Sequence, residues 1–276
     1  MLDKYILETE DLEFQYPDGT YGLKGLSIRI EQGKKIAVLG GNGAGKSTLF
    51  LHFNGIYQPT KGKVKYEGKE LTYKRSSLVE LRKNIGIVFQ DADSQLFSAS
   101  VFQEISFGPM NLKLDLFEVQ KRVEKVMNET GIIFLKDKPT HFLSYGQKKR
   151  VCIAGILAME PKVIIFDEPT DSLDPKHTQQ MMNLFDELNK QGKTVILSTH
   201  DIDKAYSWAD YIFILKDGKL LKEGPPQEIF LDSNLLEKSD LQKPWVIEVY
   251  EQLKDKGLIG KNAKVPRNKE ELFQLI

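Results

Sequence analysis

Short apolar runs recur along the chain and predict the strands of a buried sheet. Each run is rich in β-branched or aliphatic side chains and has polar residues or glycine at its ends. Such continuous runs are typical of parallel strands that are covered on both faces. The runs are residues 35–39, 85–89, 163–166 and 194–197. Residues 12–16 and 26–30 instead alternate apolar and polar positions, which predicts an antiparallel subdomain beside the parallel core.

Helical patterns fill the middle of the chain. Asp115 precedes an apolar stripe at helical spacing, and Ser144 precedes a second helix that extends to about Met159. Together these helices predict a separate lobe over about residues 91–160. Residues 77–80 match a capping box, which predicts that Ser77 caps a short helix through about Lys83.

The pattern changes after Gly224-Pro225-Pro226, and this change divides the chain. We expect a main domain over residues 1–230 and a C-terminal tail over residues 231–276. Pro244 and Asn268 begin the helices expected in the tail. Because the tail is too short to build its own core, it should pack on the main domain or on a partner.

Composition narrows the class of protein. The chain has 276 residues, 41% hydrophobic and 28% charged, with 39 basic and 39 acidic side chains. This balance argues against bulk binding of nucleic acid, and the single cysteine, Cys152, excludes disulfide and cysteine–metal frameworks and indicates a reducing compartment. No stretch approaches the roughly 20 apolar residues that span a bilayer, and no signal-peptide pattern opens the chain. We therefore expect any membrane connection to depend on partner proteins.

The stretch from Gly40 to Thr48 carries the strongest chemical signal, because it matches the phosphate-binding loop G-x-x-x-x-G-K-[ST]. It follows an expected buried strand and opens a helix, where backbone N–H groups and the helix dipole favour an anion. Lys46 would reach the β- and γ-phosphates, and the Ser47 hydroxyl would ligate Mg²⁺. A glycine-rich turn without a ligand is the alternative. The predicted nucleotide-binding residues of the loop are Gly40, Asn42, Gly43, Ala44, Gly45, Lys46, Ser47 and Thr48.

Two acidic residues follow the apolar run 163–166 and resemble the end of a Walker B strand. Because ligands bind at the carboxyl ends of parallel strands, these residues would face the phosphate-binding loop. Asp167 would hold Mg²⁺ through water, and Glu168 would act as the general base on the attacking water. In isolation, an acidic pair after a strand is usually only the start of a loop.

Leu143-Ser144-Tyr145-Gly146-Gln147 resembles the LSGGQ signature of ABC ATPases, although alone it would be only a helix cap. Four more matches occur in the family's order over about residues 5–225. They are the adenine-stacking aromatic Tyr16, the Q-loop glutamine Gln90, the D-loop Ser172-Leu173-Asp174 and the switch histidine His200. The resemblance implies an α/β fold: a P-loop ABC ATPase with a RecA-like parallel-sheet core, an N-terminal antiparallel β subdomain, a helical signature subdomain and a small helical tail.

The resemblance also implies how the site works. Two ATPase domains would meet head to tail, so that Ser144, Gly146 and Gln147 of one chain hold the γ-phosphate bound by the other. Within one chain the catalytic residues would be Glu168, His200 and Gln90, and the Mg²⁺ ligands would be Ser47, Gln90 and Asp167. Tyr145 replaces the family's usual glycine, but its backbone N–H survives, so we expect a working site.

A narrower resemblance covers residues 90–114, where QDADSQLF and EISFGPMN are similar to the ATPase subunits of energy-coupling-factor transporters. Ala92 departs from the proline of many relatives. In that family this segment receives a coupling helix of the transmembrane subunit, and apolar residues such as Phe97 and Phe107 would form the groove. An amphipathic helix that packs into its own core is the alternative. The tail also resembles those that pair two ATPase subunits.

We therefore expect an ATP- and Mg²⁺-dependent ATP hydrolase that drives a membrane importer of a cobalt or nickel ion or a vitamin. Its expected partners are a transmembrane coupling subunit, a substrate-binding membrane subunit and a second ATPase subunit, with no nucleic acid. It would lie peripherally at the cytoplasmic face of the cell membrane. The alternatives are an ABC ATPase acting on nucleic acid or ribosomes, which usually carries coiled coils, zinc cysteines or fused cassettes, and a nucleotide sensor without turnover.

Overall fold

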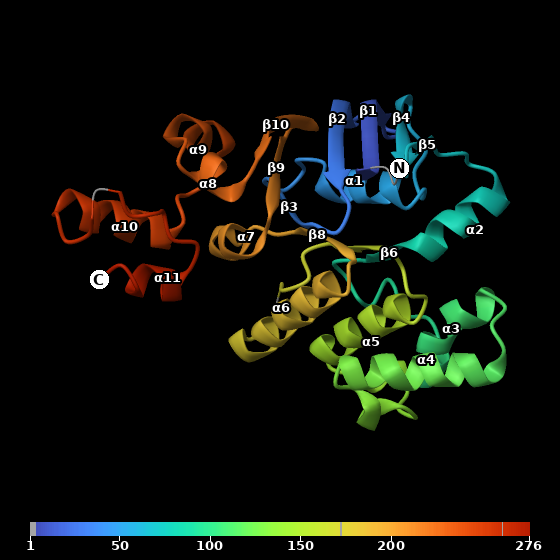
Figure 1. Ribbon diagram of the computed structural model, residues 1–276. Helices are drawn as coiled ribbons and strands as arrows, with labels where there is room; N and C mark the ends of the chain where they lie inside the picture. The colour runs from blue at the N-terminus through green and yellow to red at the C-terminus, as the bar shows by residue number, and fades with distance from the viewer. Residues whose placement is uncertain (1–3, 172, 261) are drawn as a thin grey trace.

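A computed structural model describes residues 4–171, 173–260 and 262–276 and contains two sheets with flanking helices (Figure 1). Within these ranges the larger sheet has six strands in the order β10-β9-β3-β8-β7-β6. Strands β9, β3, β8, β7 and β6 are parallel, and β10 pairs antiparallel with β9. The strands are β3 (Lys35–Leu39), β6 (Ile85–Val88), β7 (Val163–Phe166), β8 (Thr194–Ser198), β9 (Tyr211–Lys216) and β10 (Lys219–Gly224). All four continuous apolar runs are therefore strands of one sheet, as predicted.

The smaller sheet is the predicted antiparallel subdomain. Over the residues that the structure describes, its order is β2-β1-β4-β5. Its strands are β1 (Tyr5–Gln15), β2 (Tyr21–Glu31), β4 (Lys61–Tyr66) and β5 (Lys69–Glu70). Helix α1 (Lys46–Phe53) contributes Leu49, Phe50 and Phe53 to a core shared with buried residues of both sheets. The phosphate-binding loop, which precedes α1, is thus anchored between the two sheets.

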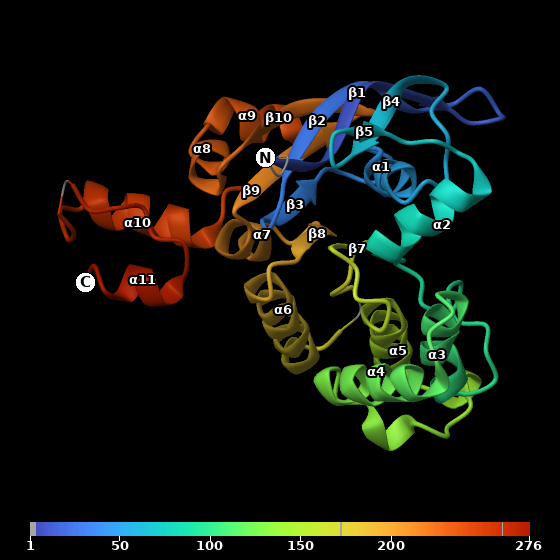
Figure 2. The ribbon, with the colours of Figure 1, turned by 45° about the vertical axis from the view of Figure 1, so that its right-hand side comes forward.

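The middle of the chain forms a helical lobe below the sheets (Figure 2). It contains α3 (Val101–Asn111), α4 (Leu116–Glu129) and α5 (Tyr145–Leu157), and α2 (Arg75–Asn84) leads toward it. Asp115 and Ser144 cap α4 and α5 as predicted, because each side chain accepts a hydrogen bond from a backbone N–H of the first turn. The prediction that Ser77 caps this helix was wrong, since α2 begins at Arg75 without a side-chain cap.

Cys152 lies on the buried face of α5. Its side chain is 3% exposed, and burial raises the pKa of its thiol to about 12. Because the reactive form of cysteine is the thiolate, this residue is inert and acts as a small core residue.

The C-terminal tail packs against α7 (Ile202–Trp208), the helix that follows the switch histidine. Arg267 donates hydrogen bonds to the carbonyls of Tyr206 at 2.8 Å and Ala209 at 2.6 Å, and the Tyr206 hydroxyl donates to the carbonyl of Pro266 at 2.9 Å. Near the start of α7, Asp203 accepts from the backbone N–H of Trp245 at 2.9 Å. The tail therefore contacts both ends of α7.

The remaining helices flank the larger sheet or belong to the tail. They are α6 (Pro175–Lys190), α8 (Pro226–Phe230), α9 (Ser233–Ser239), α10 (Trp245–Asp255) and α11 (Lys269–Phe273). The predicted division at residue 230 stays a prediction. None of the helices in the described ranges is long and apolar enough to cross a membrane.

Candidate functional site

A cavity of about 810 Å³ opens where β3, β6, β7 and β8 end. The parallel register explains the meeting point, because Val38 pairs with Ser198, and Phe166 pairs with both Val88 and Leu197. The cavity therefore gathers residues that lie more than 150 positions apart along the chain. Its lining includes Tyr16, all residues from Gly40 to Thr48, Gln90, Asp167, Glu168, Asp171 and His200.

The phosphate-binding loop depends on its glycines for its shape. Gly40 has φ 148°, and a Cβ there would lie 2.3 Å from the carbonyl oxygen of Leu215. Gly45 has φ 103° and precedes the first helical residue, Lys46. The Lys46 side chain is 8% exposed, and its ammonium donates to the carbonyls of Gly40 at 2.7 Å and Gly41 at 3.3 Å. The cation is thus held inside the loop that would wrap a phosphate.

Tyr16 lies at the rim of this cavity, where an adenine ring could stack on it. The Tyr16 hydroxyl and the Thr48 hydroxyl are 2.7 Å apart, and the ring meets Phe14 edge to face at 5.0 Å. The Thr48 hydroxyl thus orients the aromatic side chain, and its predicted contact with nucleotide stays a prediction.

The acidic residues after β7 are fixed by a serine of the neighbouring strand. The Ser198 hydroxyl donates to Asp167 Oδ1 at 2.6 Å and accepts from the Glu168 backbone N–H at 2.9 Å. Ser198 is fully buried. Ser198 was not among the predicted site residues, although its place at the end of a strand beside β7 could have suggested a role.

Glu168 has the environment of a general base. Its side chain is buried beside Lys46 Nζ at 3.6 Å and His200 Nδ1 at 3.2 Å, and its backbone is left-handed with φ 45°. Burial raises the pKa of the Glu168 carboxyl above its usual value, and the charges of Lys46 and His200 oppose that rise. A carboxylate with a raised pKa accepts a proton more readily once it is ionised.

The signature residues lie apart from this cavity. At the start of α5, Ser144 and Gln147 form a reciprocal capping box, while Gly146 follows in the first turn. Asp174 caps α6 and accepts from the backbone N–H of His177 at 3.0 Å. Ser172 of the predicted D-loop lies outside the described residues. The chain therefore brings together its P-loop, Q-loop, Walker B and switch residues but not its signature.

Comparison with known proteins agrees with this geometry. The model of the family described as ABC transporter matches residues 23–171. This chain belongs to the ABC transporter ATPases. It couples ATP hydrolysis to transport, and the predicted family, fold and enzyme class are confirmed.

Relatives narrow the assignment to the energy-coupling-factor ATPases. The chain is 51% identical to the energy-coupling factor transporter ATP-binding protein EcfA of Methanocaldococcus jannaschii, over 92% of this chain and 91% of the relative. It is 49% identical to EcfA3 of Clostridium perfringens, over 92% and 90%. Among solved structures, cbiO1 of Clostridium perfringens matches with TM-score 0.76 and 49% identity, over 90% of this chain and 99% of that one. We therefore call the chain an energy-coupling-factor ATPase.

Tyr145, the departure from the family's signature, points toward its own Q-loop. In this ABC ATPase its hydroxyl donates to the carbonyl of Gln90 at 3.0 Å. Lys149, one turn further along α5, donates to the same carbonyl at 2.6 Å and to that of Phe89 at 2.9 Å. The Tyr145 side chain therefore links α5 to the Q-loop, so Ser144 and Gly146 are the residues that remain at the N-terminus of the helix.

This geometry predicts a small effect of Tyr145→Phe on the ATPase. Because Lys149 still holds Gln90, the loss of one hydrogen bond of about 1 kcal/mol should lower kcat by less than about fivefold. Steady-state hydrolysis by the purified chain measures this. Tyr145→Gly serves as the comparison: a kcat more than about fivefold above wild type would show that the ring obstructs the site and contradict the geometry.

Proposed function

We propose that this energy-coupling-factor ATPase powers the uptake of a cobalt or nickel ion, or of a vitamin, from the cytoplasmic face of the cell membrane. The observation that supports the proposal is the cavity in which Lys46, Gln90, Asp167, Glu168 and His200 meet. Similarity to proteins described as energy-coupling factor transporter ATP-binding proteins supports a role of this ATPase site in transport. Other membrane subunits would recognise the cargo.

In the proposed reaction, ATP lies on the P-loop with its adenine against Tyr16 and its β- and γ-phosphates at Lys46. Glu168 then takes a proton from the attacking water, while His200 contacts the γ-phosphate and orients that water. Glu168 and His200 are suited to act together because their side chains already touch at 3.2 Å. Gln90, which follows the end of β6, lines the same cavity as Glu168 and His200.

A magnesium ion fits the donor groups that line the cavity. Ser47 offers a hydroxyl, Asp167 a carboxylate and Gln90 an amide oxygen, and oxygen donors of this kind are those that Mg²⁺ prefers. When bound there, Mg²⁺ would supply positive charge that offsets the negative charge of the phosphates during hydrolysis. Ser198 would hold Asp167 in place for this role through its 2.6 Å hydrogen bond.

A second ATPase subunit, identical or paralogous, would complete the site. Ser144, Gly146 and Gln147 lie outside the cavity of their own chain, so they would contact ATP bound by the partner. One similar solved structure is described as a dimeric post-hydrolysis state bound to ADP and Pi. It is 29% identical to this chain with TM-score 0.74, and the match covers 80% of this chain and 99% of that one. We propose that two ATPase subunits pair here as well, head to tail, with Asp174 at the interface and residues 231–276 assisting it.

The transmembrane subunit would dock on the groove between α2, α3 and α5. This groove has a volume of about 580 Å³, and Phe97, Phe107 and Met159 line it. Phe97 is 65% exposed and Phe107 is 48% exposed, and their rings meet edge to face at 4.7 Å. On the opposite face of α3, Val101 and Ile105 are fully buried, so the helix both packs inward and presents aromatic residues outward.

A pull-down in mild detergent from native membranes tests this function. The tagged wild-type chain should recover a transmembrane coupling subunit and a substrate-binding membrane subunit, identified by mass spectrometry. The double variant Phe97→Asp/Phe107→Asp should lose most of that recovery, at least about tenfold, because it places two charges in the apolar interface. Phe117→Asp is the matched control, since Phe117 is 79% exposed on α4 and lies outside the groove.

The same experiment separates the alternative. Recovery of ribosomes or nucleoprotein by the wild-type chain, without a membrane subunit, would overturn the importer in favour of an ABC ATPase that acts on nucleic acid. The membrane subunit that binds substrate would distinguish a metal ion from a vitamin as the cargo.

A further inference from the structure

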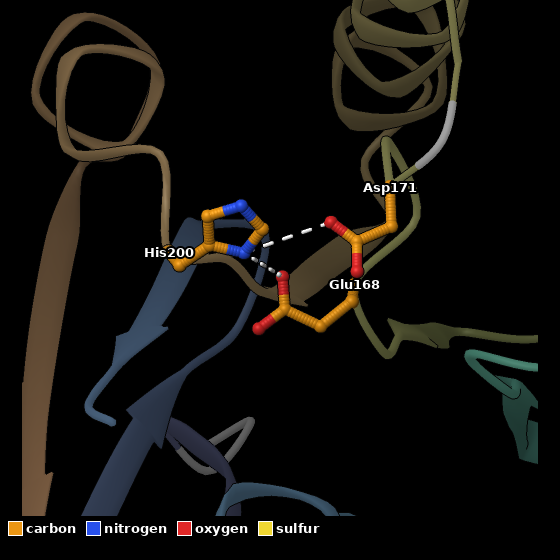
Figure 3. A group of neighbouring side chains, drawn as sticks. All are labelled: Glu168, Asp171 and His200. Atoms are coloured by element: carbon orange, nitrogen blue, oxygen red, sulfur yellow. Dashed lines mark hydrogen bonds and ion pairs between the residues drawn. The ribbon is translucent and has the colours of Figure 1, made fainter. Parts of the chain in front are cut away.

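Asp171 brings a third carboxylate into the cavity, beside those of Asp167 and Glu168, and it has no part in the reaction proposed above. It lies in the turn after β7, three residues beyond Glu168, and its carboxylate faces His200 (Figure 3). Its two oxygens have different neighbours. Oδ2 accepts a hydrogen bond from Gln90 Nε2 at 3.1 Å, and Oδ1 lies 3.6 Å from His200 Nδ1.

The contact with Gln90 fixes which end of the amide faces the metal position. A carboxylate only accepts hydrogen bonds, so the nitrogen end of the Gln90 amide must face Asp171. The oxygen end is then turned away from Asp171, and oxygen is the atom that would ligate Mg²⁺. Gln90 is itself exposed at the end of β6. Packing therefore constrains this side chain little, and Asp171 supplies the orientation.

The contact with His200 has a similar effect. The imidazole is 71% exposed, so polar neighbours rather than packing hold it. Its Nδ1 lies between two carboxylates, Glu168 at 3.2 Å and Asp171 at 3.6 Å, which places a hydrogen on Nδ1. Figure 3 shows the other ring nitrogen on the side of the ring away from Glu168, where it can face a phosphate.

We propose that Asp171 is a positioning residue for ATP hydrolysis, which orients Gln90 through one carboxylate oxygen and His200 through the other. This role of Asp171 rests on the function proposed above, because that function places Gln90 at the metal and His200 at the γ-phosphate. One side chain thereby links the Q-loop to the switch histidine within a single subunit.

The test is the Mg²⁺ dependence of ATP hydrolysis by the full-length chain. For Asp171→Ala we expect the half-saturating Mg²⁺ concentration to rise about tenfold and kcat to fall about tenfold, as is typical when a residue that orients a metal ligand is lost. Equilibrium binding of ATP without Mg²⁺ should stay within about twofold of wild type, because Lys46 and Tyr16 are untouched. Asp171→Asn keeps a single acceptor oxygen, so its half-saturating Mg²⁺ concentration and kcat should lie between those of wild type and Asp171→Ala.

A double-mutant cycle shows whether Asp171 acts through Gln90. In a Gln90→Ala background, Asp171→Ala should shift the half-saturating Mg²⁺ concentration by less than about twofold, because the group it orients is gone. A full tenfold shift in that background, or wild-type Mg²⁺ dependence in Asp171→Ala alone, would overturn the proposal. Asp137→Ala is the control, an exposed carboxylate of the helical lobe.

Failure of this proposal is distinguishable from failure of the proposed function. Glu168→Gln tests the general base independently of Asp171. If Glu168→Gln abolishes hydrolysis while Asp171→Ala behaves as wild type, the ATPase mechanism stands and the positioning role falls. If Glu168→Gln hydrolyses ATP at the wild-type rate, the proposed mechanism itself falls.

Discussion

Glu168→Gln is expected to lower steady-state ATP hydrolysis about a thousandfold, which is the range that a general base contributes. The amide keeps the size of the side chain but cannot take a proton from water. The replacement should still fold, because the contact that anchors this turn is the backbone N–H of Glu168 on Ser198, at 2.9 Å. Lys46 likewise keeps its hydrogen bonds to Gly40 and Gly41.

Nucleotide binding separates a lost base from a damaged site. Glu168→Gln should bind ATP within about threefold of wild type by calorimetry, because the P-loop and Lys46 are unchanged. Glu237→Gln, an exposed glutamate on α9, is the matched control and should hydrolyse ATP at the wild-type rate. Wild-type turnover in Glu168→Gln would show that another group activates the water.

The elements that could be predicted from sequence are those whose signal is local. Residues 35–39 and 163–166 became β3 and β7 with unchanged bounds, because buried strands leave sharp polar edges in the sequence. The start of α2 was missed for the opposite reason. Its first residue, Arg75, follows an N-cap, Lys74, that makes no side-chain capping hydrogen bond, so no local capping signal marks the start of the helix.

The same division applies to the site. Local motifs placed Lys46, Asp167 and Glu168, and the structure brings these residues into one cavity. Ser198 and Asp171 were missed, since their roles depend on the register between β7 and β8 and on the turn after β7. A serine that ends a strand and an aspartate in a turn are both common, so only the fold shows what these two side chains contact.

The aromatic residues before and within α3 show where sequence leaves two answers open. The pattern allowed either a groove for a partner helix or packing into the chain's own core. In the structure Val101 and Ile105 are fully buried in the chain's own core, whereas Phe97 and Phe107 remain exposed, as the proposed docking groove requires. Helical spacing determines which residues share a face, but neighbouring elements decide which face is covered.

Lys46→Met is expected to weaken ATP binding about a hundredfold, because charge-assisted hydrogen bonds to phosphate are the strongest that one side chain can offer here. In the structure the ammonium is held inside the loop by the carbonyls of Gly40 and Gly41. Methionine retains the apolar part of the side chain, so the loop should keep its shape. Calorimetric titration with ATP measures the loss.

The phosphate dependence of that loss identifies its cause. Lys46 would contact the β- and γ-phosphates only, so Lys46→Met should weaken AMP binding by less than about threefold while ATP loses about a hundredfold. Lys69→Ala, at an exposed lysine of β5, is the control and should bind both nucleotides normally. Equal losses for ATP and AMP would instead indicate that the loop collapses without the ammonium. In that case the role of Lys46 would be to stabilise the loop through Gly40 and Gly41, and not to recognise the triphosphate.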